Sequence, residues 1–221
     1  MIDRVARVNG IKMHYVLDGE GPPLFLLHGW PQTLFQWRLV TPALAPHYTV
    51  IAPDLRGYGG SDKPAAGYDK RTMASDIRAL ARHLGYERFR LVGHDRGARV
   101  AYRYALDWED DLERLALLDS VPTRHIFENI DKNTALTFWH FFFHQVPDLP
   151  ELLVGANVEA YLRHFYHAGA FQRGAFTPEV IARYVHAYSQ PGALRGGFND
   201  YRAAATIDLE HDAADAGRRL K

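Results

Sequence analysis

The stretch RFRLVGHDRGARVAYRYALD, residues 88–107, decides the fold of this chain. It opens with a short apolar run, which predicts a buried strand, and continues as a helix. Gly93 and Gly97 flank the junction, where glycine permits a tight turn and close contact between helix and strand. The pattern therefore predicts a strand–turn–helix unit with Asp95 at the turn.

The segments around this unit alternate between strand and helix patterns. Asn9-Gly10 is a strong hairpin signal between two stretches of alternating polarity. Residues 72–84 carry apolar side chains at helical spacing. Further strands are predicted at residues 4–8, 11–21, 22–29, 48–54 and 114–122. This order predicts an α/β fold with a mostly parallel sheet and helices on both of its faces.

The pattern of the sequence changes after Pro122. Residues 123–205 show helical patterns rich in aromatic side chains and no strand pattern. We therefore expect residues 1–122 to form an α/β core and residues 123–205 to form a helical cap over the carboxyl ends of the strands. Residues 206–221 are expected to form a return helix toward the C-terminal part of the core.

Composition excludes several classes of protein. The 221 residues include 26 Lys and Arg against 26 Asp and Glu, so nothing points to nucleic acid or a membrane surface as a partner. With no cysteine, neither a disulfide framework nor a thiolate metal site is available. No segment approaches the roughly 20 apolar residues of a spanning helix, and the charged start does not resemble a signal peptide. We expect a cytoplasmic protein that acts on a small molecule.

An aspartate at the turn indicates a particular chemistry. Strand–turn–helix nucleophile turns usually read Gly-x-Ser-x-Gly, because serine suits acyl carbons. A carboxylate that attacks an ester would form a labile anhydride. A carboxylate that attacks an sp³ carbon displaces a halide or opens an epoxide, and leaves an alkyl ester that water can hydrolyse. Asp95 therefore favours alkyl electrophiles over esters and amides.

The alternative is that Asp95 only caps the following helix. The neighbours of Asp95 weigh against this interpretation. Arg96 and Arg99 lie within one turn of the helix N-terminus, where cations oppose the helix dipole. A pair placed against that field indicates an anion close by, either Asp95 itself or a substrate carboxylate.

Three motifs resemble the α/β-hydrolase fold, and within it the haloacetate dehalogenases, including fluoroacetate dehalogenases, and the related epoxide hydrolases. The motifs are LHGWPQ at 27–32, DLRGYGGSDKP at 54–64 and GHDRGAR at 93–99. The resemblance covers essentially the whole chain. It implies the α/β-hydrolase fold and a hydrolytic reaction that needs no cofactor and no metal.

The resemblance also implies roles for individual residues. Asp95 would be the nucleophile, and Arg96 and Arg99 would clamp a substrate carboxylate. The backbone amides of Trp30 and Arg96 would form the oxyanion hole. Asp119, at the end of the next strand, would be the triad acid that orients a histidine. Tyr201, in DYRA, would hydrogen-bond the leaving group, although by itself it equally suits a core tyrosine.

The sequence departs from the family at the halide site. Fluoroacetate dehalogenases carry a His-Trp pair on the first cap helix, and the matching positions here are taken as Trp139-His140, in reverse order. A shift of one residue turns a helical side chain by about 100°. We therefore expect a changed halide site, better suited to chloride, bromide or an epoxide than to fluoride.

The second departure concerns the general base. The family's triad histidine follows two more strands, and none of the 12 histidines here follows a strand in that way. We expect a hydrolase truncated at its C-terminus, which is alkylated at Asp95 but turns over poorly. The exposed edge of the sheet would favour association between copies of the chain, for example as a homodimer.

Other interpretations stay open. His140 and His144 have a metal-ligand spacing, but phenylalanines alone separate them, so a cap helix lining an apolar pocket is favoured over a metal site. The enzymatic alternative is an epoxide hydrolase in which Tyr201 protonates the opening oxygen. An alternative of another class is a non-catalytic binder that captures a small carboxylate between the two arginines.

Overall fold

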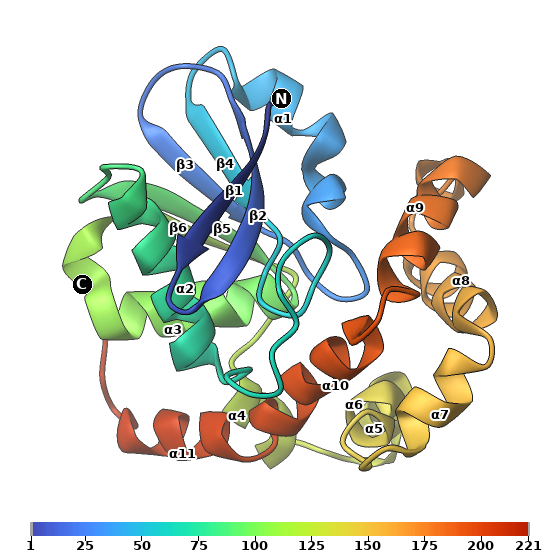
Figure 1. Cartoon of the computed structure of the whole chain (residues 1–221). Helices are drawn as coiled ribbons and strands as arrows, with labels where there is room; N and C mark the ends of the chain where they lie inside the picture. Colours follow the sequence, from blue (N-terminus) through green and yellow to red (C-terminus); the bar gives the residue numbers. More distant parts are fainter. Residues whose placement is uncertain (1, 221) are drawn as a thin grey trace.

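The structure is a computed structural model that describes residues 2–220, except the side chains of residues 168, 169 and 173. Its centre is a sheet with the strand order β1-β2-β4-β3-β5-β6 (Figure 1). The strands are β1 (Ile2–Val8), β2 (Ile11–Asp18), β3 (Pro23–Leu27), β4 (Thr49–Pro53), β5 (Phe89–His94) and β6 (Leu112–Leu118). Strands β4, β3, β5 and β6 run parallel, whereas β1 and β2 are antiparallel to their neighbours. The predicted α/β fold with a mostly parallel sheet is confirmed.

The hairpin at the start of the sheet forms as its turn residues predict. Asn9 and Gly10 both have positive φ, at 45° and 79°, which is the backbone that a two-residue turn of this kind requires. The register pairs Val8 with Ile11. The polarity alternation of the two strands therefore places one side of the hairpin against the core.

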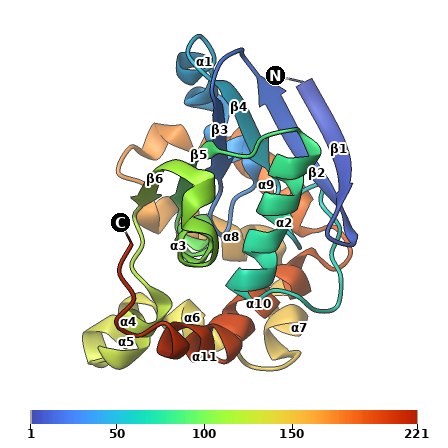
Figure 2. The ribbon, with the colours of Figure 1, turned by 90° about the vertical axis from the view of Figure 1, so that its left-hand side faces the viewer.

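Helices cover both faces of the sheet. On one face, α2 (Lys70–His83) and α3 (Arg96–Trp108) lie side by side (Figures 1 and 2). On the other face, the 3₁₀ helix η1 (Leu34–Leu39) and the short helix α1 (Thr41–Leu44) cover a smaller apolar cluster around Trp37. The predicted helix 72–84 begins two residues earlier, because the Asp69 side chain accepts a hydrogen bond from the Thr72 amide and caps it.

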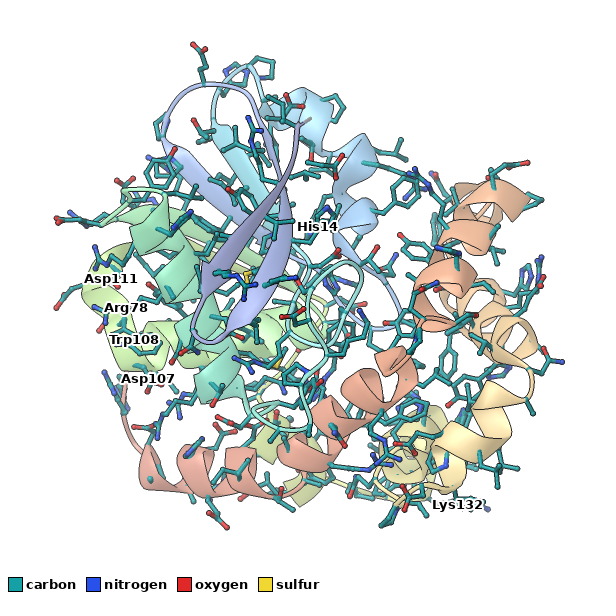
Figure 3. The ribbon with its side chains drawn as sticks, viewed as in Figure 1. His14, Arg78, Asp107, Trp108, Asp111 and Lys132 are labelled. Carbon is teal, nitrogen blue, oxygen red and sulfur yellow. The ribbon has the colours of Figure 1, made fainter. Side chains whose placement is uncertain are left out.

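Polar contacts join α2 to the end of α3. The Arg78 guanidinium lies 5.1 Å from the Trp108 ring centre and donates to Asp111 at 2.9 Å (Figure 3). Arg71 donates to Asp107 at 2.9 Å from the same side of α2. These contacts hold α2 in place beside α3, the helix that follows the Asp95 turn.

The described residues after β6 contain helices and no strand, as the sequence predicts. We call residues 123–205 the helical segment. It lies below the sheet in Figure 1 and rises along one side of it. Its helices are α4 (Thr123–Glu128), α5 (Lys132–Thr137), α6 (Trp139–Phe143), α7 (Leu149–Gly155), α8 (Val158–Gly169), η3 (Arg173–Ala175), α9 (Pro178–Tyr188) and α10 (Ala193–Ala204).

The return helix is shorter than the range 206–221 that the sequence predicts. Helix α11 spans Ile207–Ala214, and the chain then turns through Gly217 at φ +90°. Glycine readily adopts this left-handed backbone, which is incompatible with a continuing helix.

Strand β6 pairs with β5 alone within the described part of the chain. Leu117 and Leu118 on this strand are about two-fifths exposed, at 40% and 42%. Among the described residues, no helix is long and apolar enough to cross a membrane.

Candidate active site

The turn between β5 and α3 is a strained strand-to-helix elbow. Asp95 has φ +50° and ψ −113°, a backbone conformation that non-glycine residues rarely adopt. A Cβ on Gly97 would lie 2.5 Å from the Leu27 carbonyl oxygen, and one on Gly93 would lie 2.4 Å from the Gly97 carbonyl oxygen. The two glycines of the motif are therefore required for α3 to pack against the strands.

The Asp95 side chain does not cap the helix. No hydrogen bond joins it to the first turn of α3. Its Oδ1 instead accepts a hydrogen bond from the Trp30 amide at 2.8 Å. This amide follows β3, so the parallel strands β3 and β5 bring the two residues together. The capping interpretation is wrong, and Oδ2 makes no hydrogen bond to any part of the chain that the structure describes.

A cavity of about 790 Å³ opens beside Asp95 between the sheet and the helical segment. Its polar wall includes Asp95, Arg99, Asp119, His140 and Tyr201. The cavity is also lined by the aromatic side chains of Trp30, Phe138, Phe141, Phe165, Tyr166 and Phe176. The cavity therefore offers a carboxylate, a guanidinium and hydrogen-bond donors to an apolar molecule with a small anionic group.

Arg96 does not line this cavity. Its side chain is fully buried, and its guanidinium pairs with Asp200 of α10. Nε donates to Asp200 Oδ1 at 3.0 Å, and Nη2 donates both to the Asp200 backbone carbonyl at 2.9 Å and to Oδ1. Burial opposes the charge on Arg96, but the Asp200 carboxylate outweighs it and raises the pKa of the guanidinium. The Asp200 carboxylate, which is distant in sequence, binds the Nε and Nη2 donors, whereas the buried Nη1 has no hydrogen-bond partner among the described residues. The predicted role of Arg96 as a carboxylate clamp stays a prediction.

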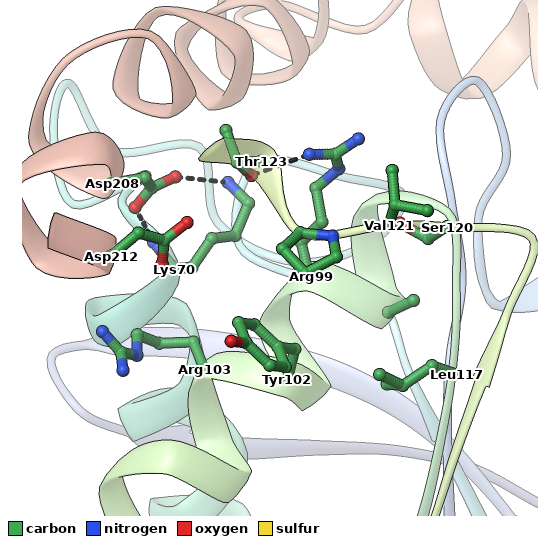
Figure 4. Close-up of a pocket in the computed structure, with 12 residues that line it drawn as sticks. Lys70, Arg99, Tyr102, Arg103, Leu117, Ser120, Val121, Thr123, Asp208 and Asp212 are labelled. Carbon is green, nitrogen blue, oxygen red and sulfur yellow. Dashed lines mark hydrogen bonds and ion pairs between the residues drawn. The ribbon is translucent and has the colours of Figure 1, made fainter. Parts of the chain in front are cut away.

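Arg99, in contrast, reaches the cavity wall without a carboxylate partner among the described residues. Its Nη1 donates to Thr123 Oγ1 at 2.7 Å, as Figure 4 shows, and its buried Nε has no hydrogen-bond partner. The residue is 5% exposed. Burial, with the nearby Arg96 charge, lowers the pKa of Arg99 to about 10. A buried cation without an anionic partner is energetically costly, so an anion that binds beside Arg99 would be stabilised.

Tyr201, on α10, lines the same cavity as Asp95. Its side chain is 2% exposed, and its hydroxyl makes no hydrogen bond with any described residue. Burial and the Asp95 charge raise its pKa well above the usual value, so the hydroxyl stays protonated. The Arg96 guanidinium carbon lies 4.3 Å from the centre of the Tyr201 ring. Tyr201 therefore belongs to the buried core, as the alternative interpretation has it, but no backbone carbonyl of the described residues accepts from its hydroxyl.

The residues next to Tyr201 correct the predicted pair Trp139-His140. His140 lines the cavity, with its ring 5.9 Å from Tyr201, and burial lowers its pKa to about 4. Trp139 is 37% exposed, lies outside the cavity lining and packs on His164 and Phe165. Phe141 takes the place beside Tyr201, at 5.1 Å between ring centres. The pair that faces the site is therefore His140-Phe141, one residue later than predicted.

Asp119 lies just after β6, where the sequence predicts the triad acid. Its φ is +49° and its side chain is exposed at the cavity wall. None of the hydrogen bonds or ion pairs of the described histidines involves Asp119. The Arg96 amide, predicted as the second oxyanion donor, makes no hydrogen bond within the described residues, and that role stays a prediction.

Two sets of side chains bear on metal binding. His140 and His144, which have a metal-ligand spacing in the sequence, have ring centres 5.7 Å apart, and His144 Nε2 lies 2.6 Å from the Tyr161 hydroxyl, which fits packing in the helical segment. Among the described residues, Asp69, Asp208 and His211 place possible ligand atoms close together, and the Lys70 ammonium lies 3.3 Å from Asp208 Oδ2. The Lys70 ammonium therefore supplies the positive charge beside Asp208 that a metal ion would otherwise supply.

Two functional candidates escaped the sequence analysis. Phe141 was hidden by the one-residue ambiguity in an aromatic run. Asp200 immediately precedes Tyr201 in DYRA, and a carboxylate next to that tyrosine on an otherwise apolar helix face is the signal that could have pointed to it.

Comparison with known proteins identifies the class. Residues 22–211 match the family model described as the alpha/beta hydrolase fold, and the chain belongs to this family. Within the family, it belongs to the branch of the haloacetate dehalogenases and related epoxide hydrolases.

Two curated relatives and one solved structure define this branch. The chain is 45% identical to a fluoroacetate dehalogenase of Burkholderia sp over 229 residues, which covers 99% of this chain and 74% of the relative. It is 45% identical to a soluble epoxide hydrolase of Corynebacterium sp. strain C12 over 210 residues, covering 93% and 73%. The structure of the epoxide hydrolase CorEH superposes with a TM-score of 0.94 at 43% identity, covering 100% of this chain and 79% of the other.

Proposed function

We propose that this chain acts on a small 2-haloacid through an aspartyl-ester intermediate. The observation that carries the proposal is the buried Arg99 guanidinium, which faces the same cavity as Asp95 and has no carboxylate partner among the described residues. A bound substrate carboxylate would supply the missing anion. The relative described as a fluoroacetate dehalogenase supports this substrate class.

The first step uses groups that are already in place. Asp95 Oδ2 attacks the carbon that bears the halogen, the new C–O bond forms, and the halide leaves with the electrons of the C–X bond. The Tyr201 hydroxyl and the neutral His140 ring, which line the same cavity, are the hydrogen-bond donors for the halide. Because Oδ1 already accepts from the Trp30 amide, the ester carbonyl oxygen would form inside its oxyanion site.

The second step needs a general base. Water attacks the ester carbonyl carbon, its proton passes to the base, and the hydroxy acid leaves as the Asp95 carboxylate is regenerated. Asp119 would orient a histidine for this purpose, and no described histidine contacts it. We therefore expect the ester to persist on this chain.

The test is mass spectrometry of the intact chain after incubation with bromoacetate. The expected result is one added carboxymethyl group, mapped to Asp95, with one bromide released per chain. The absence of cysteine removes the usual competing nucleophile. Asp95→Asn is the matched control, since its side-chain oxygen can still accept from Trp30. Modification of both chains to the same extent would contradict the proposal, whereas rapid multiple turnover by the parent chain would contradict only the expected persistence of the ester.

An epoxide is the second candidate substrate. The free and protonated Tyr201 hydroxyl favours it, because an opening epoxide must receive a proton whereas a halide needs only hydrogen bonds. Chloride release from chloroacetate and ester formation from styrene oxide separate the two candidates. A chain that binds acetate but forms no ester with either reagent would instead be a carboxylate binder.

We also propose that the helical segment, residues 123–205, acts as a cap on the core of residues 1–122, with residues 206–221 returning to that core. Support comes from the cavity, whose lining includes Asp95 and Asp119 from the core and His140 and Tyr201 from the helical segment.

A further inference from the structure

Four of the aromatic side chains that line the cavity beside Asp95 form a group that the proposed reaction does not use. We call this group the aromatic slot, and its members are Trp30 after β3, Phe165 and Tyr166 on α8, and Phe176 after η3. The Trp30 and Phe165 rings meet edge to face, with their centres 4.7 Å apart. The Tyr166 and Phe176 rings stack at 4.8 Å, with 14° between their planes. Phe165 and Phe176 nevertheless stay only half-buried, so their rings have surface left to cover.

The aromatic slot offers ring surface rather than hydrogen bonds or charge. The Tyr166 hydroxyl donates to the Pro31 carbonyl oxygen at 2.5 Å, so this group is already satisfied. The Trp30 indole N–H is buried beside Gly197 of α10, so it is not presented to the cavity. None of the four side chains carries a charge. The aromatic slot therefore favours an uncharged, apolar group.

The aromatic slot and Arg99 approach the reacting groups through different side chains. The Trp30 amide donates to Asp95 Oδ1, and the Trp30 ring lies 5.7 Å from the Tyr201 ring. The Arg99 guanidinium carbon lies 5.5 Å from the Phe141 ring centre, and Phe141 in turn lies 5.1 Å from Tyr201. A molecule whose carboxylate binds at Arg99 and whose reacting carbon meets Asp95 can therefore direct a substituent toward the aromatic slot.

The cavity is larger than a two-carbon haloacid requires. Its volume of about 790 Å³ falls within the range of roughly 300–1,000 Å³ that is typical of pockets for drug-sized ligands. A haloacetate would fill only a small part of this volume and would leave the rings of the aromatic slot in contact with water. Moving an aryl group from water onto these rings would strengthen binding roughly 10- to 100-fold, the range for burying one large apolar side chain.

We propose that the aromatic slot binds an aryl substituent of the substrate. The preferred haloacids are then 2-halo-3-arylpropanoates rather than haloacetates. The methylene between the ring and the reacting carbon lets the ring reach the aromatic slot without crowding the attack on that carbon. The chemical step is unchanged: the bond from Asp95 Oδ2 to the reacting carbon forms, and the halide leaves with the electrons of the C–X bond. This inference rests on the proposed function and names the substrate class within it.

The test compares 2-bromo-3-phenylpropanoate with 2-bromopropanoate, as single enantiomers of the same configuration. Both reagents react at a secondary carbon, and they differ by one phenyl ring. The measured quantity is the ratio of their second-order rates of ester formation at Asp95, each divided by the rate of the uncatalysed reaction with free acetate. The expected ratio for the parent chain is about 10 to 100. Ester formation with a ratio near one would overturn the inference.

Phe176 supplies the matched variants. Phe176→Ala removes one ring of the aromatic slot and is expected to lower the ratio roughly 2- to 10-fold, the range for one aromatic pair. Phe176→Tyr keeps the ring and is expected to keep the ratio. Phe171→Ala is the control, because Phe171 lies in the same connection between α8 and α9 but is fully exposed, at 102%. A fall of the ratio in Phe171→Ala that equals the fall in Phe176→Ala would overturn the inference.

Binding of acids that cannot alkylate separates this inference from the proposed function. Calorimetric titration compares 3-phenylpropanoate with propanoate, neither of which carries a leaving group. Tighter binding of 3-phenylpropanoate that is weakened in Phe176→Ala, without ester formation from either bromoacid, would overturn the proposed function and uphold the aromatic slot. Ester formation at Asp95 with equal binding of the two acids would overturn the inference and uphold the proposed function.

Discussion

Replacing Arg99 by methionine is expected to stabilise the folded chain. The guanidinium is 5% exposed and has no carboxylate partner within the described residues, so the folded state bears the cost of burying its charge. Burial and the Arg96 charge lower its pKa from 12.5 to about 10, which corresponds to about 3 kcal/mol. Because the folded pKa lies below the unfolded one, this cost is fully present at neutral pH and is relieved only as the pH rises through about 10.

The substitution also removes the hydrogen bond to Thr123, whereas the contact of the guanidinium with the Phe141 ring, at 5.5 Å, is replaced by a contact of the methionine sulfur with that ring. The hydrogen bond to Thr123 is worth about 1.5 kcal/mol or somewhat more, so the net gain from Arg99→Met is about 1 kcal/mol. In urea unfolding at pH 7, this gain raises the midpoint by about 0.5 M at an ordinary slope of about 2 kcal/mol per M. Acetate is expected to raise the midpoint of the parent chain and to leave that of Arg99→Met unchanged.

Arg96→Met is the matched control, and its effect has the opposite sign. Removing Arg96 leaves the Asp200 carboxylate buried with fewer partners, which costs about 3–5 kcal/mol. If Arg99→Met lowers the midpoint as far as Arg96→Met does, Arg99 is a satisfied structural residue, and the reasoning about a vacant anion site is refuted.

Three further predictions follow from single contacts. Gly97→Ala brings a Cβ within 2.5 Å of backbone oxygens and is expected to lower the free energy of unfolding in urea by about 3 kcal/mol. Gly155→Ala is the control and is expected to leave that free energy unchanged, because the nearest atom to its Cβ belongs to Leu194 at 3.9 Å. Hydrogen bonding to Asp54 raises the pKa of His14 above 6.5. His14 therefore contributes stability below pH 6.5, and this contribution is lost as the pH rises through the pKa of the folded state. A His14→Gln chain whose stability has the same pH dependence as that of the parent chain would contradict this prediction. Asp95→Asn is expected to abolish ester formation by mass spectrometry and to leave the urea midpoint unchanged, and a large loss of stability would show that the carboxylate is a structural group.

The local sequence determined the order of strands and helices and the place of the turn that carries Asp95. Apolar runs, the Asn9-Gly10 turn and the glycines around Asp95 act through contacts between residues near one another in the chain. The parallel arrangement then brought the ends of β3 and β5 together, so that the Trp30 amide meets Asp95 as the motifs imply. These features depend on backbone sterics and on the periodicity of apolar residues, and both can be read from a single sequence.

Tertiary packing alone decided which side chains face the cavity. Arg96 and Arg99 occupy the same turn of one helix, yet one is neutralised by Asp200, 104 residues away, and the other is not. In the same way, a run of aromatic residues is compatible with several rotations of its helix, and contacts with Tyr201 selected His140 and Phe141 over Trp139. Whether a buried charge is neutralised depends on the partner that the fold brings next to it. The spacing of residues within one helix carries no information about that partner.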